Sequence, residues 1–259
     1  MIGHWINGEE RASDGGRTFD AIDPWLQAPH SSVALGDAAD ADAALTAARR
    51  AFDDGPWPRA SVAERASVLH RLADLLLVHA DELASADCSD MGKPLADAVE
   101  RDVPRAAQNV RFFADHARLS TAEAYPMPTG HHAFCRYEPA GVVVAIAPWN
   151  FPLMLETWKV APALAWGNTV VLKPAEQSPS SATRLARLAT AAGLPDGVLN
   201  VVQGVGEEVG AVLTLDPRAD RVTFTGSSAT GRTVAAAAAA NLAPVSLELG
   251  GKSANGIMD

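Results

Sequence analysis

The amino-acid sequence predicts an α/β protein with a doubly wound parallel sheet and a helical region before it. Two observations lead to this fold class. From Gly141 onward, short runs rich in Val and Ile alternate with helical stretches, which is the pattern of a parallel sheet covered on both faces. Before that point, apolar residues recur at helical spacing. The composition, with 48% hydrophobic and 20% charged residues in a chain of 259, is that of an ordinary globular protein.

The N-terminal part contains a predicted hairpin followed by predicted helices. Asn7-Gly8 is a strong turn signal, so residues 4–9 should form the hairpin. Ser61 and Glu64 form a capping-box pattern, after which apolar residues follow helical spacing. We therefore expect one helix from Ser61 to about Cys88. Further helices are expected at residues 40–52 and 94–119.

The second part alternates predicted strands with predicted helices. The strands are expected at residues 142–147, 169–172, 198–202, 221–225 and 246–249, and the helices at residues 153–166, 179–192, 207–215 and 229–241. The helix from Pro179 has the clearest limits, with Ser178 as the expected N-cap and Gly193 past its end. Sheets of this kind bind ligands at the carboxyl ends of their strands, so the segments that leave each strand are candidate sites.

Charge and cysteine content exclude several classes of partner. The formal net charge of -10 argues against nucleic acid and anionic membranes, because both need a basic surface. The longest apolar runs have the length of strands, and the first residues show no signal-peptide pattern. Cys88 and Cys135 provide neither a disulfide framework nor the spacing of a metal site. We therefore expect a cytoplasmic, reduced protein that holds no metal.

The first predicted strand leads into Ala147-Pro148-Trp149-Asn150-Phe151-Pro152, and the G-x-G-x-x-G of the usual dinucleotide fingerprint is absent there. Asn150 has two interpretations. It can be a turn residue that bonds its own backbone between two prolines. It can also be an amide donor at the mouth of a strand, placed to stabilise a developing oxyanion.

The second predicted strand ends in Lys173-Pro174-Ala175-Glu176. A Lys and a Glu three residues apart often form a solvated ion pair. In a dinucleotide fold, however, an acidic group at this place bonds the ribose hydroxyls. Glu176 would do so for NAD and would repel the additional phosphate of NADP, while Lys173 could donate to the same ribose.

Two glycine-rich segments follow the third and fourth predicted strands. The segment 204–210 has weak phosphate-loop spacing and can equally be a turn that leads into a helix. In the second segment, Gly226 and Ser227 would begin the next helix. Ser227 is expected to cap that helix, whose free amides and dipole would favour a pyrophosphate.

The last predicted strand runs into Leu247-Glu248-Leu249-Gly250-Gly251-Lys252. A carboxylate inside an apolar strand end must be paired, protonated or functional. Burial would raise the pKa of Glu248 toward the range of a general base. A structural ion pair with Lys252 is the alternative.

Taken together, these motifs resemble the NAD-dependent aldehyde dehydrogenase superfamily over nearly the whole chain. The marks are four motifs in order, each leaving a strand, at residues 148–152, 173–176, 224–227 with Gly231, and 247–252. The resemblance implies that a cysteine thiolate attacks an aldehyde, that hydride passes to NAD, and that water then releases a carboxylic acid.

The resemblance also implies roles for particular residues. Asn150 would donate to the oxyanion and Glu248 would be the general base. Lys173 and Glu176 would hold the adenosine ribose, and Gly226 with Ser227 the pyrophosphate. The remaining residues expected along the cofactor are Ile146, Pro148, Trp149, Gly206 and Phe224.

The sequence departs from the family in its cysteines. The family's nucleophile comes well after the residue that matches Glu248, in a separate catalytic domain, and neither Cys88 nor Cys135 occupies that place. We therefore expect a fragment with the catalytic domain missing and without dehydrogenase turnover of its own. Two alternatives stay open: a non-catalytic nucleotide-binding or interaction protein that assembles with full-length homologues, and an incomplete product that does not fold stably.

The resemblance divides the chain into three predicted segments. Residues 1–136 would form the helical region with its hairpin and an oligomerisation strand near residues 131–137. Residues 137–251 would form an NAD-binding Rossmann-like domain, and residues 252–259 would begin the catalytic domain. The complete protein would be a homo-oligomer.

A narrower resemblance concerns the substrate. The segments 104–106, 109–114 and 157–162 look like the branch that acts on hydroxymuconic-type semialdehydes. Those substrates carry carboxylates, which Arg105 or Arg111 could bind. An arginine on a helix surface is the alternative.

Overall fold

The computed structural model describes residues 1–128 and 130–253. Its main sheet has seven strands, in the order β11 (Val245–Leu249), β10 (Arg221–Gly226), β7 (Val142–Ile146), β8 (Thr169–Lys173), β9 (Leu199–Val201), β1 (His4–Ile6) and β2 (Glu9–Arg11). The strands from β11 to β9 run parallel, as predicted. The chain moves outward from β7 through β8 and β9, then returns to β10 on the other side. The strand order therefore reverses at β7, the place where such sheets bind ligands.

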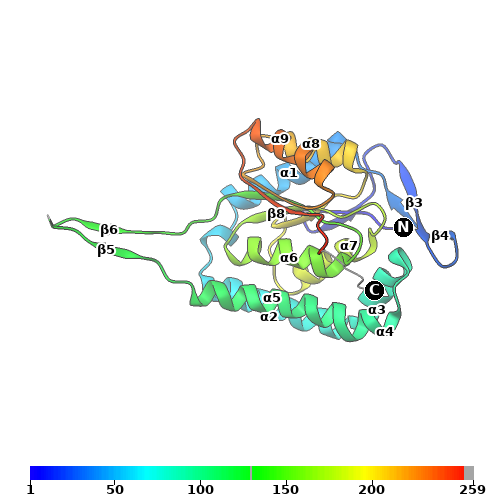
Figure 1. Cartoon of the computed structure of the whole chain (residues 1–259), viewed down its shortest axis with the longest axis horizontal. Coiled ribbons are helices and arrows are strands. Elements are labelled where there is room, and N and C mark those ends of the chain that lie inside the picture. The colour runs from blue at the N-terminus through cyan, green and yellow to red at the C-terminus, as the bar shows by residue number, and fades with distance from the viewer. Residues whose placement is uncertain (129, 254–259) are drawn as a thin grey trace, which may run out of the picture.

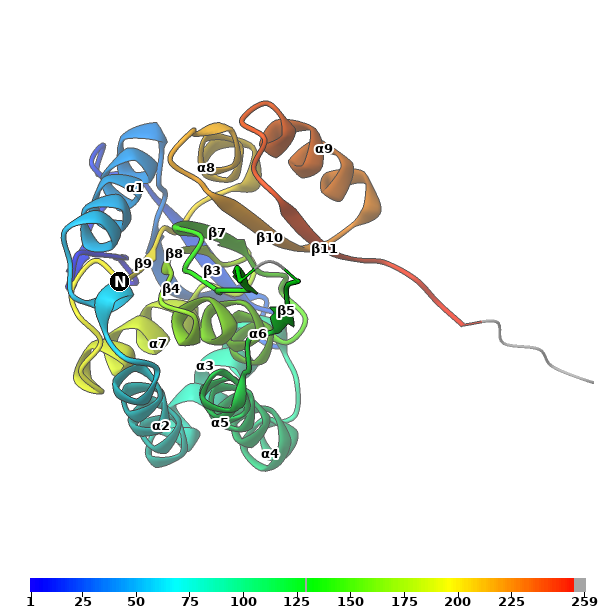
Figure 2. The ribbon, with the colours of Figure 1, turned by 90° about the vertical axis from the view of Figure 1, so that its left-hand side faces the viewer.

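Helices cover both faces of this sheet (Figure 2). One face carries α1 (Ala38–Asp53), α8 (Ala211–Leu215) and α9 (Ser228–Ala239). The other carries α6 (Pro152–Ala165) and α7 (Ser180–Ala191), with α2 (Val62–Val78), α3 (Ala80–Met91) and α5 (Val103–Leu119) packed behind them. The doubly wound fold with N-terminal helices alongside is therefore confirmed.

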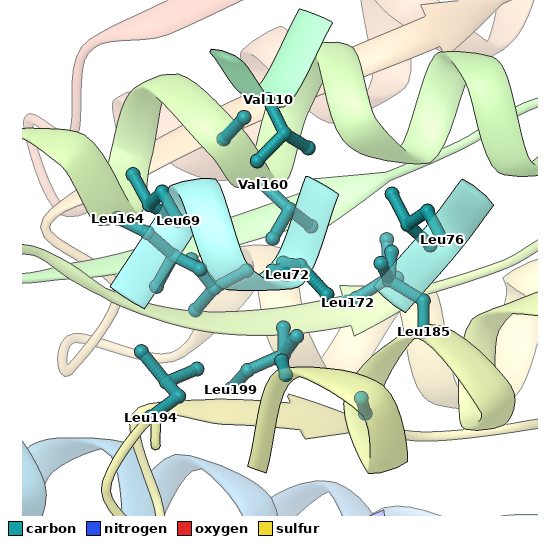
Figure 3. Close-up of a cluster of buried hydrophobic side chains, with 14 of the residues drawn as sticks. Leu69, Leu72, Leu76, Val110, Val160, Leu164, Leu172, Leu185, Leu194 and Leu199 are labelled. Atoms are coloured by element: carbon teal, nitrogen blue, oxygen red, sulfur yellow. The ribbon is translucent and has the colours of Figure 1, made fainter. Parts of the chain in front are cut away.

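The larger hydrophobic core joins these helices to the sheet (Figure 3). Leu69, Leu72 and Leu76 lie on the apolar face that the spacing of α2 predicts, and all are at most 2% exposed. They meet side chains from α5, α6, α7, β8 and β9, namely Val110, Val160, Leu164, Leu185, Leu172 and Leu199. The N-terminal helices thus share one core with the parallel sheet.

The N-terminal hairpin, β1 and β2, extends the sheet. Its two-residue turn has positive φ at both Asn7 (54°) and Gly8 (82°), which matches the twist of the strands. Trp5 pairs with Val201 of β9. The hairpin is confirmed. Its strands belong to the same sheet as those after residue 137, although the predicted division places them in a different segment. The division between residues 136 and 137 stays a prediction. Local turn signals do not specify which distant strand a hairpin will pair with.

Two helical predictions need correction. The helix from Ser61 ends at Val78, and the chain begins α3 after His79, so Cys88 lies on a separate helix. The predicted helix 94–119 is α4 (Leu95–Asp97), a π-helical segment η2 (Ala98–Asp102) and α5. Pro104, in the first turn of α5, has no backbone N–H to donate to the preceding turn, which favours the wider π turn before it.

The predicted cap of α7 is also wrong. Pro179 occupies the N-cap position, and the Ser178 hydroxyl is buried without a hydrogen-bond partner among the described residues. The Ser180 amide instead donates to Asp90 Oδ2 at 2.8 Å, and the Ser180 hydroxyl donates to Asp90 Oδ1 at 2.8 Å. Asp90 belongs to α3, so a distant helix provides the cap.

The remaining elements lie around this body. Two further hairpins are β3 (Thr18–Asp23) with β4 (Ala28–Ala34), and β5 (Ala124–Pro126) with β6 (His132–Phe134). The β5–β6 hairpin projects far from the rest of the chain (Figure 1). Short helical segments are η1 (Trp57–Arg59) and the π-helical η3 (Gly206–Gly210). Within residues 1–128 and 130–253, no helix is both long and apolar enough to cross a membrane.

Candidate active site at the carboxyl edge of the sheet

The strand register brings the predicted site segments to one edge of the sheet. Ile146 of β7 lies beside Lys173 of β8 on one side and beside Phe224 of β10 on the other. Phe224 in turn pairs with Leu247 of β11. Ile146, Lys173, Phe224 and Leu247 thus form one row across the four strands. Asn150, Glu176, Ser227 and Glu248 each follow the row residue of their own strand by one to four positions.

The segment after β7 is open to solvent. Trp149 is 55% exposed, Asn150 is exposed and Pro148 is partly buried. Within the described residues, the Asn150 side chain forms no hydrogen bond, so the interpretation as a turn residue bonded to its own backbone is not what the structure contains. Its amide is available as a donor just before α6 begins at Pro152.

Lys173 and Glu176 form an ion pair of unequal burial. The Lys173 side chain is 2% exposed, and its Nζ donates to Pro174 O at 2.8 Å and lies 3.4 Å from Glu176 Oε2. Burial lowers the pKa of the Lys173 ammonium, and the nearby Glu176 opposes that change. The Glu176 side chain is partly open to solvent. The interpretation as a solvated surface pair is therefore wrong for the lysine, whose stem is covered by the sheet and by Gly210.

The second glycine-rich segment begins a helix as predicted. Ser227 is the N-cap of α9, and its hydroxyl accepts the Thr230 amide at 3.1 Å. Gly226 ends β10, where an added Cβ would lie 2.5 Å from the Phe224 ring. The first turn of α9 therefore presents free amides at the edge of the sheet, which favours an anion. Gly206 is exposed at the start of η3, with open space around it.

The expectation that Glu248 is buried is wrong. Its strand, β11, is the outermost of the parallel strands, and Glu248 is exposed. The alternative ion pair with Lys252 is not formed among the described residues either. The sequence pattern suggested burial because apolar residues flank Glu248, but the place of a strand within a sheet is not encoded in its own residues.

Lys159 is a neighbour of Glu248 that sequence reasoning missed. Its side chain lies in the interior between α6 and β10, and its Nζ donates to Thr223 Oγ1 at 3.3 Å. Burial lowers the pKa of Lys159 to about 8, although the charge of Glu248 opposes this. The available signal was a charged residue within a largely apolar helix pattern at residues 153–166, where Glu156 is the other charge.

A hollow beside the predicted site is not lined by the predicted cofactor residues. It has a volume of about 600 Å³ and lies between α6 and the strands β10 and β11. Of the predicted site residues only Glu248 lines it, together with Lys159, Thr223 and Thr225. Among the predicted cofactor residues, Ile146, Lys173 and Phe224 lie instead in one row near the carboxyl ends of β7, β8 and β10.

A second, smaller hollow of about 350 Å³ lies between α5 and α6. It is lined by Arg105, Gln108, Asn109, Phe112, Phe113 and Trp158. Arg105 donates to Gln108 Oε1 at 3.1 Å. Arg111 points elsewhere and pairs with Asp74, so the structure separates the two arginines that the sequence left as equal candidates.

Comparison with known proteins identifies relatives along the whole chain. The model of the aldehyde dehydrogenase family matches residues 11–259. The NADP/NAD-dependent aldehyde dehydrogenase PuuC of Escherichia coli (strain K12) is 47% identical over 252 residues, which are 97% of this chain and 51% of PuuC. The 2-hydroxymuconic semialdehyde dehydrogenase of Pseudomonas sp. (strain CF600) is 45% identical over 258 residues, 98% of this chain and 53% of the relative.

Solved structures agree with these relatives. An indole-3-acetaldehyde dehydrogenase in complex with NAD⁺ superposes with a TM-score of 0.96 at 43% identity, covering 98% of this chain and 51% of that chain. This chain spans about half the length of the curated relatives that it matches. The chain belongs to the aldehyde dehydrogenase family.

Proposed function

We propose that this chain forms the NAD-binding half of an aldehyde dehydrogenase. The observation that carries the proposal is the ion pair between the buried Lys173 and the partly exposed Glu176, on the same sheet edge as the start of α9. Lys173 has an N–H left to donate to a ribose hydroxyl after its bonds to Pro174 and Glu176. The Glu176 carboxylate accepts from ribose hydroxyls and repels a phosphate in their place, which favours NAD over NADP.

The rest of the cofactor would follow the same edge. The free amides of α9, with Gly226 and Ser227, would hold the pyrophosphate. Ile146, Pro148, Trp149, Gly206 and Phe224 would line the remaining path. When bound, NAD supplies the acceptor for the hydride that leaves the substrate.

Two residues of this chain would take part in the chemistry. The Asn150 amide would donate to the oxyanion that forms when the aldehyde carbonyl is attacked. Glu248 would act as a general base, and its charge opposes the lowering of the pKa of the nearby Lys159.

The nucleophile would come from neither cysteine of this chain. Burial and the neighbouring Asp87 raise the pKa of Cys88, which makes it a poor thiolate. Cys135 directly follows β6 of the projecting β5–β6 hairpin, and its amide donates to Glu123 O at 2.7 Å. We therefore expect this chain alone to bind cofactor without oxidising aldehydes.

The smaller hollow favours a substrate with a carboxylate. Arg105 stands beside the aromatic side chains of Phe112 and Trp158, a combination suited to an unsaturated acid. A 2-hydroxymuconic semialdehyde dehydrogenase is among the relatives. We propose that the complete enzyme takes a carboxylate-bearing aldehyde of this type.

Calorimetric titration of the purified chain with NAD and with NADP tests the cofactor proposal. We expect saturable binding of NAD and weaker binding of NADP, and Glu176→Gln should narrow the difference between them. Glu123→Gln, on the β5–β6 hairpin, is the matched control and should change neither affinity. An absence of saturable NAD binding by a folded chain would contradict the proposal.

A non-catalytic partner of full-length homologues is the second candidate. The projecting β5–β6 hairpin favours it, because an isolated two-stranded ribbon is seldom stable without a surface to pack on. Co-expression with a tagged full-length relative tests this candidate. Removal of residues 124–134 should abolish co-purification, and retention of the partner without the hairpin would count against it.

A further inference from the structure

The helix α3 satisfies the first amides of the two crossover helices that begin beside the site. The Leu153 amide of α6 donates to Asp87 Oδ2 at 3.3 Å, and the Ser180 amide of α7 donates to Asp90. Such amides have no partner within their own helix. The N-cap of α6 is Phe151, which offers no side-chain bond, and Pro152 has no amide to donate. Asp87 therefore provides a cap that the sequence of α6 lacks.

A second contact from the same region reaches Phe151, the residue directly after Asn150. Lys93, two residues after α3, places its Nζ 4.2 Å from the centre of the Phe151 ring. Lys93 is also paired with Asp102 of η2, and both side chains are largely buried. A desolvated cation over an aromatic ring is attractive. Gly92, which ends α3 with a φ of 72°, turns the chain so that Lys93 can reach this position.

We propose that Asp87 and Lys93 together are positioning residues for Asn150. One holds the Leu153 amide and the other holds the Phe151 ring, so the short segment that carries the Asn150 amide is fixed from α3. The inference rests on the proposed role of Asn150 as an oxyanion donor. Neither Asp87 nor Lys93 needs to touch a substrate for this role.

The groups around Asp87 make its charge sensitive to pH. Asp90, Cys88 and Lys93 interact with it from α3 and the residues that follow. Glu156 does so from α6, and Ser181 from α7. Burial raises the pKa of Asp87 to about 7 and raises that of Glu156 well above its ordinary value. The bond from Leu153 is charge-assisted only when Asp87 is ionised, but burial disfavours that ionisation more strongly than the bond favours it. Opening that exposes Asp87 to water therefore becomes easier as the pH rises through about 7, and the anchor should loosen in that window.

Hydrogen exchange of the full chain tests the anchor. Protection factors, which remove the intrinsic pH effect, are measured for residues 150–155 between pH 6 and 8. We expect Leu153 protection to fall in this window by about tenfold, because the buried Asp87 carboxyl ionises less readily than the exposed one. In Asp87→Asn, whose amide oxygen can still accept from Leu153, the fall should vanish, while the protection of Ser180 and of α9 stays unchanged. A uniform loss across α3, α6 and α7 would overturn the proposal, since it indicates a general structural role.

A spectroscopic measurement tests Lys93. Relaxation of the Asn150 side-chain NH₂ signal should show greater mobility in Lys93→Met and recovery in Lys93→Arg, which keeps a cation over the ring. Arg101→Met is the matched control, because Arg101 forms an exposed pair with Asp97 in the same region. Unchanged mobility of the Asn150 amide in Lys93→Met would overturn the proposal.

The outcome is separable from the proposed function. If the wild-type chain fails to bind NAD, the proposed function fails, while the exchange and relaxation data still decide whether α3 fixes the Asn150 segment. If Asp87→Asn does not fold, the pH dependence of Leu153 protection in the wild-type chain alone decides.

Discussion

The starts of α6 and α9 differ in what satisfies their first amides, although both helices follow a strand of the same sheet. At α9 the helix caps itself through Ser227, the residue directly before it. At α6 the cap comes from Asp87 on α3, and at α7 it comes from Asp90 on the same helix. A local cap depends only on the residue next to the helix start. A cap from another helix also depends on how the two helices pack against each other, so it fixes the position of the helix start relative to the rest of the chain.

The largest expected effect comes from removing a cap between helices. Asp90→Ala leaves the Ser180 amide and hydroxyl without their acceptor and removes the partner of His30, which lies 2.9 Å from Asp90 Oδ1. Because these groups are buried, we expect a loss of about 3 kcal/mol in unfolding free energy. Urea denaturation measures it, and a loss no larger than that of a local serine cap would break the comparison.

The second largest effect is a change in how the free energy of unfolding depends on pH. Burial raises the pKa of Asp87 from 3.8 to about 7, so the folded chain holds a proton that the unfolded chain releases between these values. The stabilisation from this group is therefore complete below pH 3.8 and is lost as the pH rises through about 7. Between pH 5 and 8, the free energy of unfolding should therefore fall by on the order of 2 kcal/mol less in Asp87→Asn than in the wild-type chain.

Urea unfolding at four pH values measures this change. Asp81→Asn, at an exposed position of the same helix, is the matched control and should leave the slope as it is. A wild-type chain whose stability is flat between pH 5 and 8 would contradict the expectation.

A smaller effect is expected at Lys159, in the interior beside β10. Burial lowers the pKa of this ammonium from 10.5 to about 8, so the unfolded chain binds more protons between pH 8 and 10.5 and wild-type stability should rise across that window. Lys159→Met should remove the rise and stabilise the chain at pH 7 by about 1 kcal/mol. Thermal unfolding at pH 7 and 9.5 measures both, with the exposed Lys252→Met as control. A less stable Lys159→Met at pH 7 would mean that Glu248 compensates the buried charge fully.

The smallest effect compares two local caps. Ser61 and Ser227 each accept an amide from the first turn of their own helix, so Ser61→Ala and Ser227→Ala should each cost about 1 kcal/mol. Only Ser227→Ala should also weaken NAD binding, because only α9 begins at the site edge. Equal NAD affinity in the two variants would leave Ser227 with a capping role alone.

Local signals in the sequence predicted most of the elements. The turn at Asn7-Gly8, the capping box of Ser61 and the alternation of strands and helices after Gly141 all have a physical cause within a few residues, and the structure confirms each. Because parallel sheets bind ligands at the carboxyl ends of their strands, the sequence also predicted that the candidate site residues lie along one edge of the sheet. Their roles in binding and catalysis stay predictions.

The errors concern relations between distant residues. Ser178 has the composition of an N-cap, but Asp90, far away in sequence, provides the cap of α7. Glu248 has apolar neighbours in its strand, but β11 lies at the edge of the parallel strands, where those neighbours do not cover it. Lys159 acquires its lowered pKa from β10, which packs over it from another part of the chain. None of these partners can be read from a local window.

The two outermost strands of the main sheet have unequal surroundings. β2 has only three residues, all of them charged and exposed, and such short charged strands resist pairing with another chain. β11 is longer and carries Leu247 and Leu249, and no strand pairs with its outer side in the part of the chain that the structure describes. A further strand can therefore pair with β11, whereas pairing with β2 is disfavoured, so the sheet can be extended at one edge only.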